Sequence, residues 1–185
     1  DGKMLATTFI EVKHKCYGRG VKRRLRLPME DALDLANGKV AKMLTDGGSL
    51  SRYERMVVDE ILSLVHVRKF KFLCTMRYDR QAFVGGDHAP DLRVTFDTGI
   101  ACRFQELDLQ ADDQRFEHYL IPNDRCVMEI KTCSVVPTWL RNLVGSKALV
   151  QRGFSKFCLA LENHDPIVRA SIYGPDSVHF QTAKT

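Results

Sequence analysis

The chain has 185 residues, a net charge of +5 at pH 7 and 44% hydrophobic residues. This length predicts a single domain, or one with a small appendage, and the hydrophobic content excludes an intrinsically disordered chain. The basic balance favours an anionic partner and leaves nucleic acid, phospholipid and phosphate esters open. No apolar run reaches the roughly 18–20 residues of a transmembrane helix. Six scattered cysteines without CxxC spacing favour a reduced, intracellular and soluble protein.

Two strands are predicted at 7–16 and 21–27, joined by a glycine-containing turn at 17–20. Side chains alternate between the two faces of a sheet, so each strand gathers its charges on one face and its apolar residues on the other. The charged face therefore combines a row of cations with one carboxylate. Its predicted members are Glu11, Lys13, Lys15, Lys22, Arg24 and Arg26.

Helical patterns follow the two strands. A helical stretch at 28–44 is interrupted at 37–38 by Asn-Gly, which favours two short helices. Ser51 and Glu54 form a capping-box pattern before an amphipathic helix that ends near 67. Both helices are expected to cover an apolar sheet face.

The second half of the chain has mostly strand signals. Residues 106–124 are polar and are expected to form a loop or short exposed elements. Strands before helices, and strands again after them, favour an α+β fold with an antiparallel sheet. The remaining predicted elements are strands at 71–81, 91–98, 100–105 and 125–133, a helix from Pro137 and a short apolar segment at 154–161.

Charged residues share a face in these later strands as well. Arg93, Thr95 and Asp97 lie on one face of their strand, and Glu129 and Lys131 lie on one face of theirs. Several strands with the same mixture of cations and carboxylates favour a wet, charged barrel interior that binds a strong anion such as polyphosphate. An ordinary sheet with its charged face in solvent is the alternative.

Six short stretches carry a family resemblance, in order and over most of 7–161. They are FIEVK at 9–13, YDRQAF at 78–83, LRVTFDT at 92–98, VMEIK at 127–131, PTWL at 137–140 and FSKF at 154–157. The sequence resembles the VTC-type polyphosphate polymerase domain, of the triphosphate tunnel superfamily related to CYTH proteins. The resemblance implies an antiparallel β-barrel tunnel with flanking helices that forms one domain over 1–185. That domain would lack N-terminal strands of the family, among them one with an Arg-x-Arg pair.

The resemblance also implies roles for single residues. Arg suits a bidentate contact with phosphate and Lys a point charge, whereas Mg²⁺ or Mn²⁺ needs one or two carboxylates beside phosphate oxygens. Glu129 would hold the metal. The phosphate-binding cations of the catalytic site would be Lys13, Arg80, Arg93 and Lys156, with Glu11, Lys15, Lys22, Arg24, Arg26, Lys131 and Ser155 also around the ligand.

The expected activity is transfer of the γ-phosphoryl group of ATP to inorganic polyphosphate, without a nucleic-acid partner. The chain departs from the family at Gly153, where some members have a lysine. A triphosphate hydrolase of the same fold and a non-catalytic polyphosphate-binding module are the alternatives. We expect a cytoplasmic enzyme, or one at the cytosolic face of a membrane assembly with an accessory subunit.

Each proposed site residue also has a structural interpretation. The cations of the first two strands would then form a solvated face or a nucleic-acid patch, although interleaved aromatic residues are missing. Arg93 would pair with Asp97, and Glu129 with Lys131 across the sheet. Arg77 is a rival of Arg80 for the pocket. Ser155 lacks a recognisable His and Asp, so we do not expect a nucleophile there.

Overall fold

The computed structural model describes residues 7–16, 19–39, 50–110, 113–147, 149 and 151–165, without the side chains of 15, 16 and 19. It confirms an α+β fold with antiparallel sheets. The chain divides into two compact units, residues 1–73 with 109–112 and residues 74–108 with 113–185. No helix in these described ranges has the length and apolarity needed to cross a bilayer. The prediction of one tunnel domain over 1–185 stays a prediction.

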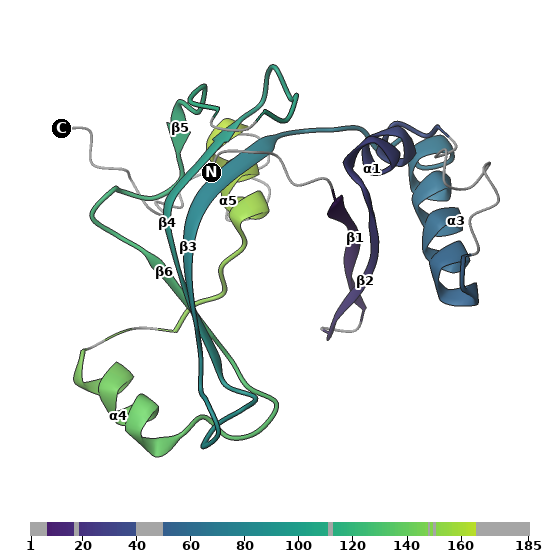
Figure 1. Ribbon diagram of the computed structural model, residues 1–185. Helices are drawn as coiled ribbons and strands as arrows, with labels where there is room; N and C mark the ends of the chain where they lie inside the picture. The colour runs from purple at the N-terminus through teal and green to yellow at the C-terminus, as the bar shows by residue number, and fades with distance from the viewer. Residues whose placement is uncertain are drawn as a thin grey trace. The chain divides into compact units, whose positions relative to one another are not determined.

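In its described residues, the first unit consists of a hairpin with two helices on one side (Figure 1). Strands β1 (Thr7–Cys16) and β2 (Arg19–Pro28) are antiparallel, and pairing of Cys16 with Arg19 confirms the predicted hairpin. Helix α1 (Met29–Ala36) ends where Asn-Gly was expected to interrupt it. The remainder of that predicted helical stretch, at 40–44, lies outside the described residues.

Helix α3 (Arg52–His66) begins at the predicted capping box. The Ser51 hydroxyl accepts from the Glu54 amide at 3.3 Å, and the Glu54 carboxylate accepts from the Ser51 amide at 2.8 Å. The apolar faces of the hairpin and of both helices close into one core, which leaves the other hairpin face to its charges. The buried core residues are Val12, Leu25, Leu27, Ala32, Leu35, Val57, Val58 and Ile61.

The second unit is built around β4 (Arg93–Arg103), which pairs with three strands. These are β3 (Thr75–Val84), β5 (His118–Tyr119) and β6 (Val127–Lys131), all antiparallel to β4. Helix α4 (Thr138–Ser146) follows β6, and α5 (Lys156–His164) lies beside the long strands (Figure 1). The segment expected as a short apolar stretch is thus a helix.

Several strand boundaries differ from the prediction, among them those of β2 and β6, which were expected at 21–27 and 125–133. The strand expected from 71 begins at Thr75, because Thr75 pairs with Arg103 at the end of β4 and the residues before it have no ladder partner. The strands expected at 91–98 and 100–105 are one continuous strand. The polar segment at 106–124 contains the two-residue exposed strand β5, which agrees with the short exposed elements expected there.

A bulge at Gly99 keeps β4 continuous. Pairing shifts by one residue between Arg77 and Asp79, so that β4 holds one residue more than β3 at this point. Gly99 has φ +56°, a conformation that glycine adopts without steric cost. The shift places Asp97 and Ile100 on the same sheet face, which plain alternation would separate.

That shared face is polar at one end and apolar at the other. Beyond the bulge, Ile100 and Cys102 pack with Leu120 and with Ala160 of α5 in a buried core. Before the bulge, the same face carries Asp97 and the charged residues of β3 and β6. Helix α5 therefore covers the apolar end with its body and reaches the polar end with its first turn.

Candidate anion-binding site

Asp97 and Arg80 form a buried ion pair across the sheet. They are direct partners in the β3–β4 register, and Asp97 is 1% exposed. The Arg80 guanidinium donates from Nε to Oδ1 at 2.6 Å and from a terminal nitrogen to Oδ2 at 2.7 Å. This bidentate contact fixes the plane of the guanidinium group.

Lys156 binds the same carboxylate from α5. Its Nζ lies 2.5 Å from Asp97 Oδ2. Lys156 is the first residue of α5, whose N-cap Ser155 accepts a hydrogen bond from the Cys158 amide at 3.3 Å. The cap and the packing of Ala160 thus determine where the ammonium group lies, and Ser155 has the structural role expected of a helix cap.

One aromatic ring contacts both cations. The Tyr78 ring centroid lies 4.5 Å from Lys156 Nζ and 5.1 Å from the guanidinium carbon of Arg80. The Phe154 ring lies 5.9 Å from Lys156 Nζ. The negative ring face attracts a cation, so the aromatic contact adds to the attraction of the carboxylate.

The electrostatics of the group follow from these contacts. Hydrogen bonds from Arg80 lower the pKa of Asp97, against the opposing effect of burial, and Lys156 lowers it further. The hydrogen bonds with Asp97 raise the pKa of Arg80, to which the negative charge of Glu129 also contributes. Asp97 is therefore ionised, and Arg80 keeps its charge at neutral pH.

The same sheet face continues through β6. Arg93 pairs in register with Lys131, and Thr95 pairs with Glu129. Glu129 and Lys131 are in contact at 3.2 Å, so the predicted ion pair is present, but it forms along β6 and not across the sheet as expected. The predicted pair of Arg93 with Asp97 is wrong, because Arg80 and Lys156 bind that carboxylate.

Thr95 has an unusual environment at the centre of this face. It is 4% exposed, and its hydroxyl oxygen is buried without a hydrogen-bond partner in the described part of the chain. A buried hydroxyl without a partner costs folding free energy. Its neighbours in register are Ala82 on β3 and Glu129 on β6.

Asp91 fixes the end of β6 and so the place of Glu129. Its Oδ2 accepts hydrogen bonds from the Thr132 hydroxyl at 2.7 Å and from the Cys133 amide at 2.9 Å. The amide and hydroxyl of Ser134 add two bonds, each of 2.9 Å. The hydrogen bonds from Thr132 and Ser134 lower the pKa of Asp91 to about 2.

Glu129 fits only a metal that takes most of its ligands from elsewhere. No cluster of three or more His, Cys, Asp or Glu side chains that could hold a metal occurs in the described residues. The Glu129 side chain is 46% exposed and is paired only with Lys131 among the contacts described. One accessible carboxylate suits Mg²⁺ or Mn²⁺ that is otherwise bound by phosphate oxygens and water.

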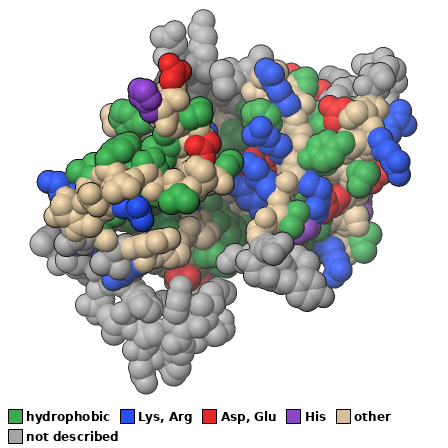
Figure 2. Space-filling view, turned by 90° about the horizontal axis from the view of Figure 1, so that it is seen from below, with side chains coloured by type: hydrophobic (Ala, Val, Ile, Leu, Met, Phe, Trp, Pro, Cys, Tyr) green, Lys and Arg blue, Asp and Glu red, His purple; other side chains and the backbone are tan. Residues whose placement is uncertain are grey.

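A second basic surface lies on the charged face of the β1–β2 hairpin, as predicted. Lys13 and Lys22 contact Glu11 at 3.0 and 3.1 Å, and Arg24 stacks over the Phe9 ring at 4.7 Å. Figure 2 shows Lys and Arg side chains gathered over this hairpin, in the right half of the view. Burial raises the pKa of Glu11, but the hydrogen bonds and charges of the two lysines lower it overall.

Four cations against one carboxylate leave this hairpin surface with an excess of positive charge. Arg26 reaches the Thr7 hydroxyl at 3.5 Å. Neither Arg24 nor Arg26 has a carboxylate partner among the residues that the structure describes. The Lys15 side chain lies outside the described part. The hairpin belongs to the first unit, and Arg80, with the sheet around it, belongs to the second.

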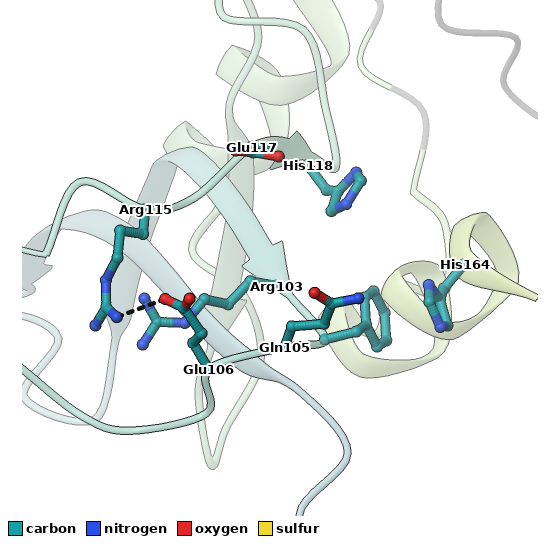
Figure 3. A pocket seen from close by; sticks show the side chains of 8 residues that line it. Arg103, Gln105, Glu106, Arg115, Glu117, His118 and His164 are labelled. Atoms are coloured by element: carbon teal, nitrogen blue, oxygen red, sulfur yellow. Dashed lines mark hydrogen bonds and ion pairs between the residues drawn. The ribbon is translucent and has the colours of Figure 1, made fainter.

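A cavity of about 440 Å³ in the second unit does not suit an anion (Figure 3). Arg103 donates to Asp113 and to the carbonyl of Asp108, and Arg115 is bound by Glu106, Asp108 and Asp113. The carboxylates thus neutralise both arginines. The residues that line it are Arg103, Phe104, Gln105, Glu106, Arg115, Glu117, His118 and His164.

The structure therefore brings part of the predicted site together on one sheet face. Arg80, Arg93, Glu129, Lys131 and Lys156 share the second unit and this face, or reach it from α5. Their roles in binding stay predictions, as do those of Lys13 and the other hairpin cations. The rival side chain at 77 points elsewhere and contacts residues 113 and 114.

Two residues were missed by sequence reasoning. Tyr78 belongs to a recognised motif but received no role, and Asp97 was assigned to a different partner. The signal for Asp97 is its position between Arg93 and the bulge, on a face with an excess of cations. The contacts themselves join residues 17 and 59 positions apart, which no local pattern reveals.

Comparison with protein families gives one result. The family model described as the VTC domain matches residues 2–163, which is most of the chain. A search among curated proteins finds no match.

Proposed function

Because the chain belongs to the VTC domain family, we propose that it is a metal-dependent polyphosphate polymerase. It transfers the γ-phosphoryl group of ATP to the end of a growing inorganic polyphosphate chain. The family supports a polyphosphate-related function, the finer assignment to a polymerase comes from the motif resemblance, and the cations of the sheet face suit it. ATP and polyphosphate are then its partners, and the activity belongs in the cytoplasm.

The observation that supports this proposal most is the pair of cations on Asp97. Arg80 and Lys156 come from β3 and α5 and meet at one carboxylate oxygen. Arg93 and Lys131 extend the positive charge along the same face. Phosphoryl transfer requires positioning and charge neutralisation more than covalent participation of the protein, and this face supplies both.

The reaction needs no oxidant or reductant. The terminal oxygen of the polyphosphate chain attacks the γ-phosphorus of ATP, a new P–O bond forms, and the bond to the β-phosphate oxygen breaks to release ADP. Arg80, Arg93 and Lys156 neutralise the charge on the transferred group. Glu129 would hold the metal ion, which neutralises phosphate oxygens when bound.

The proposal includes the β-barrel tunnel that the family resemblance implies, because a linear polymer needs a path. The charged hairpin face, with Lys13, Lys22 and Arg24, would contribute to binding of the product chain. Its excess of positive charge supports this role.

Incubation of the protein with ATP and Mn²⁺ tests the proposal. We expect long polyphosphate, with one ADP released for each phosphoryl group added to the polymer. Gel electrophoresis and ³¹P NMR detect the two products. The variant Arg93→Gln should lose at least about 10-fold in rate, because one phosphate contact is removed without disturbing a buried pair. Arg125→Gln removes an exposed arginine of the same unit and should retain the full rate.

Other products overturn the proposal. Release of orthophosphate without polymer identifies a hydrolase. Binding of tripolyphosphate without turnover of ATP identifies a binding module. A full polymerase rate in Arg93→Gln would show that the protein is a polymerase but that this sheet face is not its active site.

A further inference from the structure

We propose that Asp97 and Tyr78 are positioning residues that hold Arg80 and Lys156 together as a clamp for one phosphate group. This inference rests on the proposed function for its kinetic readout only. It assigns to the two residues a task that the cations alone do not perform.

The first argument is charge repulsion. Arg80 and Lys156 both bring a nitrogen within hydrogen-bonding distance of Asp97 Oδ2, at 2.7 and 2.5 Å. Two positive groups that share one oxygen lie side by side and repel each other unless a negative charge lies between them. Asp97 provides that charge, and the clamp keeps a net charge of +1.

The second argument is accessibility. The side chain of Asp97 is 2% exposed, whereas those of Arg80 and Lys156 are 31% and 21% exposed. A phosphate group that approaches from solvent meets the cations and not the carboxylate. Asp97 therefore acts through the two cations, which distinguishes it from a metal ligand or a general base.

The third argument concerns the hydrogen-bond donors. Arginine has five N–H groups, of which two bond Asp97 here, and the lysine ammonium has three, of which one does so. Tyr78 attracts both cations through its ring face and accepts no further N–H bond from them in the contacts described. The cations are thus held in place while N–H groups remain to bind phosphate oxygens.

The fourth argument is the origin of the parts. Arg80 and Tyr78 come from β3, Asp97 from β4 and Lys156 from the first turn of α5. A long lysine or arginine side chain loses rotamer freedom when a ligand binds it. Because Asp97 and Tyr78 already order both side chains, less of that loss falls on the binding of substrate, and the donors are aligned for the transition state.

The kinetic test uses Asp97→Asn. Loss of the carboxylate raises the net charge of the clamp, which favours anion binding and offsets the lost ordering of the two side chains, so affinity for tripolyphosphate and KM for ATP should stay within about 3-fold of wild type. The kcat should fall about 10–100-fold, because the two cations no longer hold the productive geometry. Calorimetry, steady-state kinetics and a thermal melt measure these quantities in the whole chain.

Matched variants separate positioning from damage to the fold. Asp79→Asn removes an exposed carboxylate of β3 on the opposite sheet face and should leave kcat unchanged. Tyr78→Phe keeps the ring and should keep kcat, whereas Tyr78→Leu should lower it in the same direction as Asp97→Asn. A wild-type kcat in a folded Asp97→Asn protein would overturn the proposal.

A binding experiment tests the clamp without any turnover. Tripolyphosphate affinity is measured for Arg80→Gln, Lys156→Gln and the double variant, with Asp97 and again with Asn at that position. With Asp97 the two cations act as a unit, so the double variant should lose little more than either single variant. With Asn the two losses should multiply.

The two sets of results distinguish the two proposals. The clamp proposal is overturned if the affinity losses of Arg80→Gln and Lys156→Gln combine in the same way with Asp and with Asn at position 97. This conclusion does not depend on which reaction the protein catalyses. Absence of polymer with the expected change in additivity overturns the polymerase assignment and leaves the clamp as part of a binding site. A melt of each variant ensures that only folded protein enters the comparison.

Discussion

At the scale of single residues, Thr95 and Asp97 contrast in how their buried polar groups are satisfied. Asp97 is bound by two cations, and its carboxylate makes three contacts. Thr95 lies two residues away on the same face and has a buried hydroxyl without a partner in the described chain. Such a group lowers the free energy of unfolding unless another interaction offsets its desolvation, and polar groups of this kind concentrate at functional sites.

The variant Thr95→Val should therefore stabilise the protein. It replaces an unpartnered buried hydroxyl with a methyl group of similar size, and we expect the free energy of unfolding to rise by about 1 kcal/mol. Chemical denaturation measures this change.

Thr75→Val provides the matched comparison in the same strand system. Thr75 is also buried, at 9% exposure, but its hydroxyl donates to the Leu107 carbonyl at 3.1 Å. Here we expect a loss of about 1 kcal/mol, because a satisfied hydrogen bond is removed and a carbonyl is left without its donor. Two variants that destabilise equally would show that the hydroxyl of Thr95 is satisfied.

Residue patterns predicted which charges share a face but not which charges pair. Alternation placed Glu129 beside Lys131, and their contact at 3.2 Å agrees. It could not place Lys156 on Asp97, because that contact depends on how α5 packs against the sheet. Tertiary contacts between distant segments decide such pairs, and sequence periodicity carries no information about them.

At the scale of elements, the bulge at Gly99 determines which residues share the sheet face of Asp97. Before it, the face holds Asp97 and after it Ile100, so one strand serves both a charged site and an apolar core. The sequence contains the signal, since glycine inside a strand marks a bulge. We interpreted it instead as a break between two strands, because both meanings fit a Thr-Gly step.

Two glycine-to-alanine variants should have opposite effects on stability. Gly99 has φ +56°, and a Cβ there would lie 3.3 Å from the Asp79 carboxylate, so Gly99→Ala should cost about 1–2 kcal/mol. Gly145 lies inside α4 with open space around its Cα, and Gly145→Ala should gain up to about 1 kcal/mol. Thermal denaturation of both variants checks the sign.

The two helices α3 and α5 differ in how well the sequence predicted them. The capping box at Ser51 predicted the start of α3 because the motif satisfies orphan amides locally. Helix α5 was expected only as an apolar segment, since its nine residues are too few to show a clear helical period. Its first residue is nevertheless the one that the family resemblance selected.

At the scale of the whole molecule, the chain carries two basic surfaces, one in each compact unit. The hairpin surface has Lys13, Lys22 and two arginines against Glu11. The sheet of the second unit has its own cations around Asp97. A short anion is expected to use the second surface alone, whereas a long polymer has the length to contact more of the protein.

Charge removal on the hairpin should therefore distinguish ligands by length. We expect Arg24→Gln to lower affinity for long-chain polyphosphate about 5-fold, from loss of about 1 kcal/mol of ionic contact, and to leave tripolyphosphate affinity unchanged. Calorimetry with the two ligands measures both. Arg52→Gln, which removes an exposed arginine of α3, should change neither. Equal losses of affinity for both ligands in Arg24→Gln would contradict the expectation that a short anion uses the second surface alone.

Fold class and the charged faces were thus predictable from the sequence, because both follow from local periodicity. The division into two compact units was not, because it depends on which segments pack together across the chain. The same limit applies to the site: Arg80, Arg93 and Lys156 share one sheet face while Lys13 lies in the other unit, and the carboxylate that Arg80 and Lys156 share was not foreseen.

The position of Lys156 at the very start of α5 has a consequence for motion. Helices open first at their ends, and this end of α5 is held by the Ser155 cap and by the contact of Lys156 with Asp97, to which a bound phosphate would add a further contact. By thermodynamic linkage, an anion bound to the sheet face would raise the free energy needed to unwind α5. Unwinding of α5 would in turn lower the affinity for the anion. Substrate release and local unfolding would then become a single event.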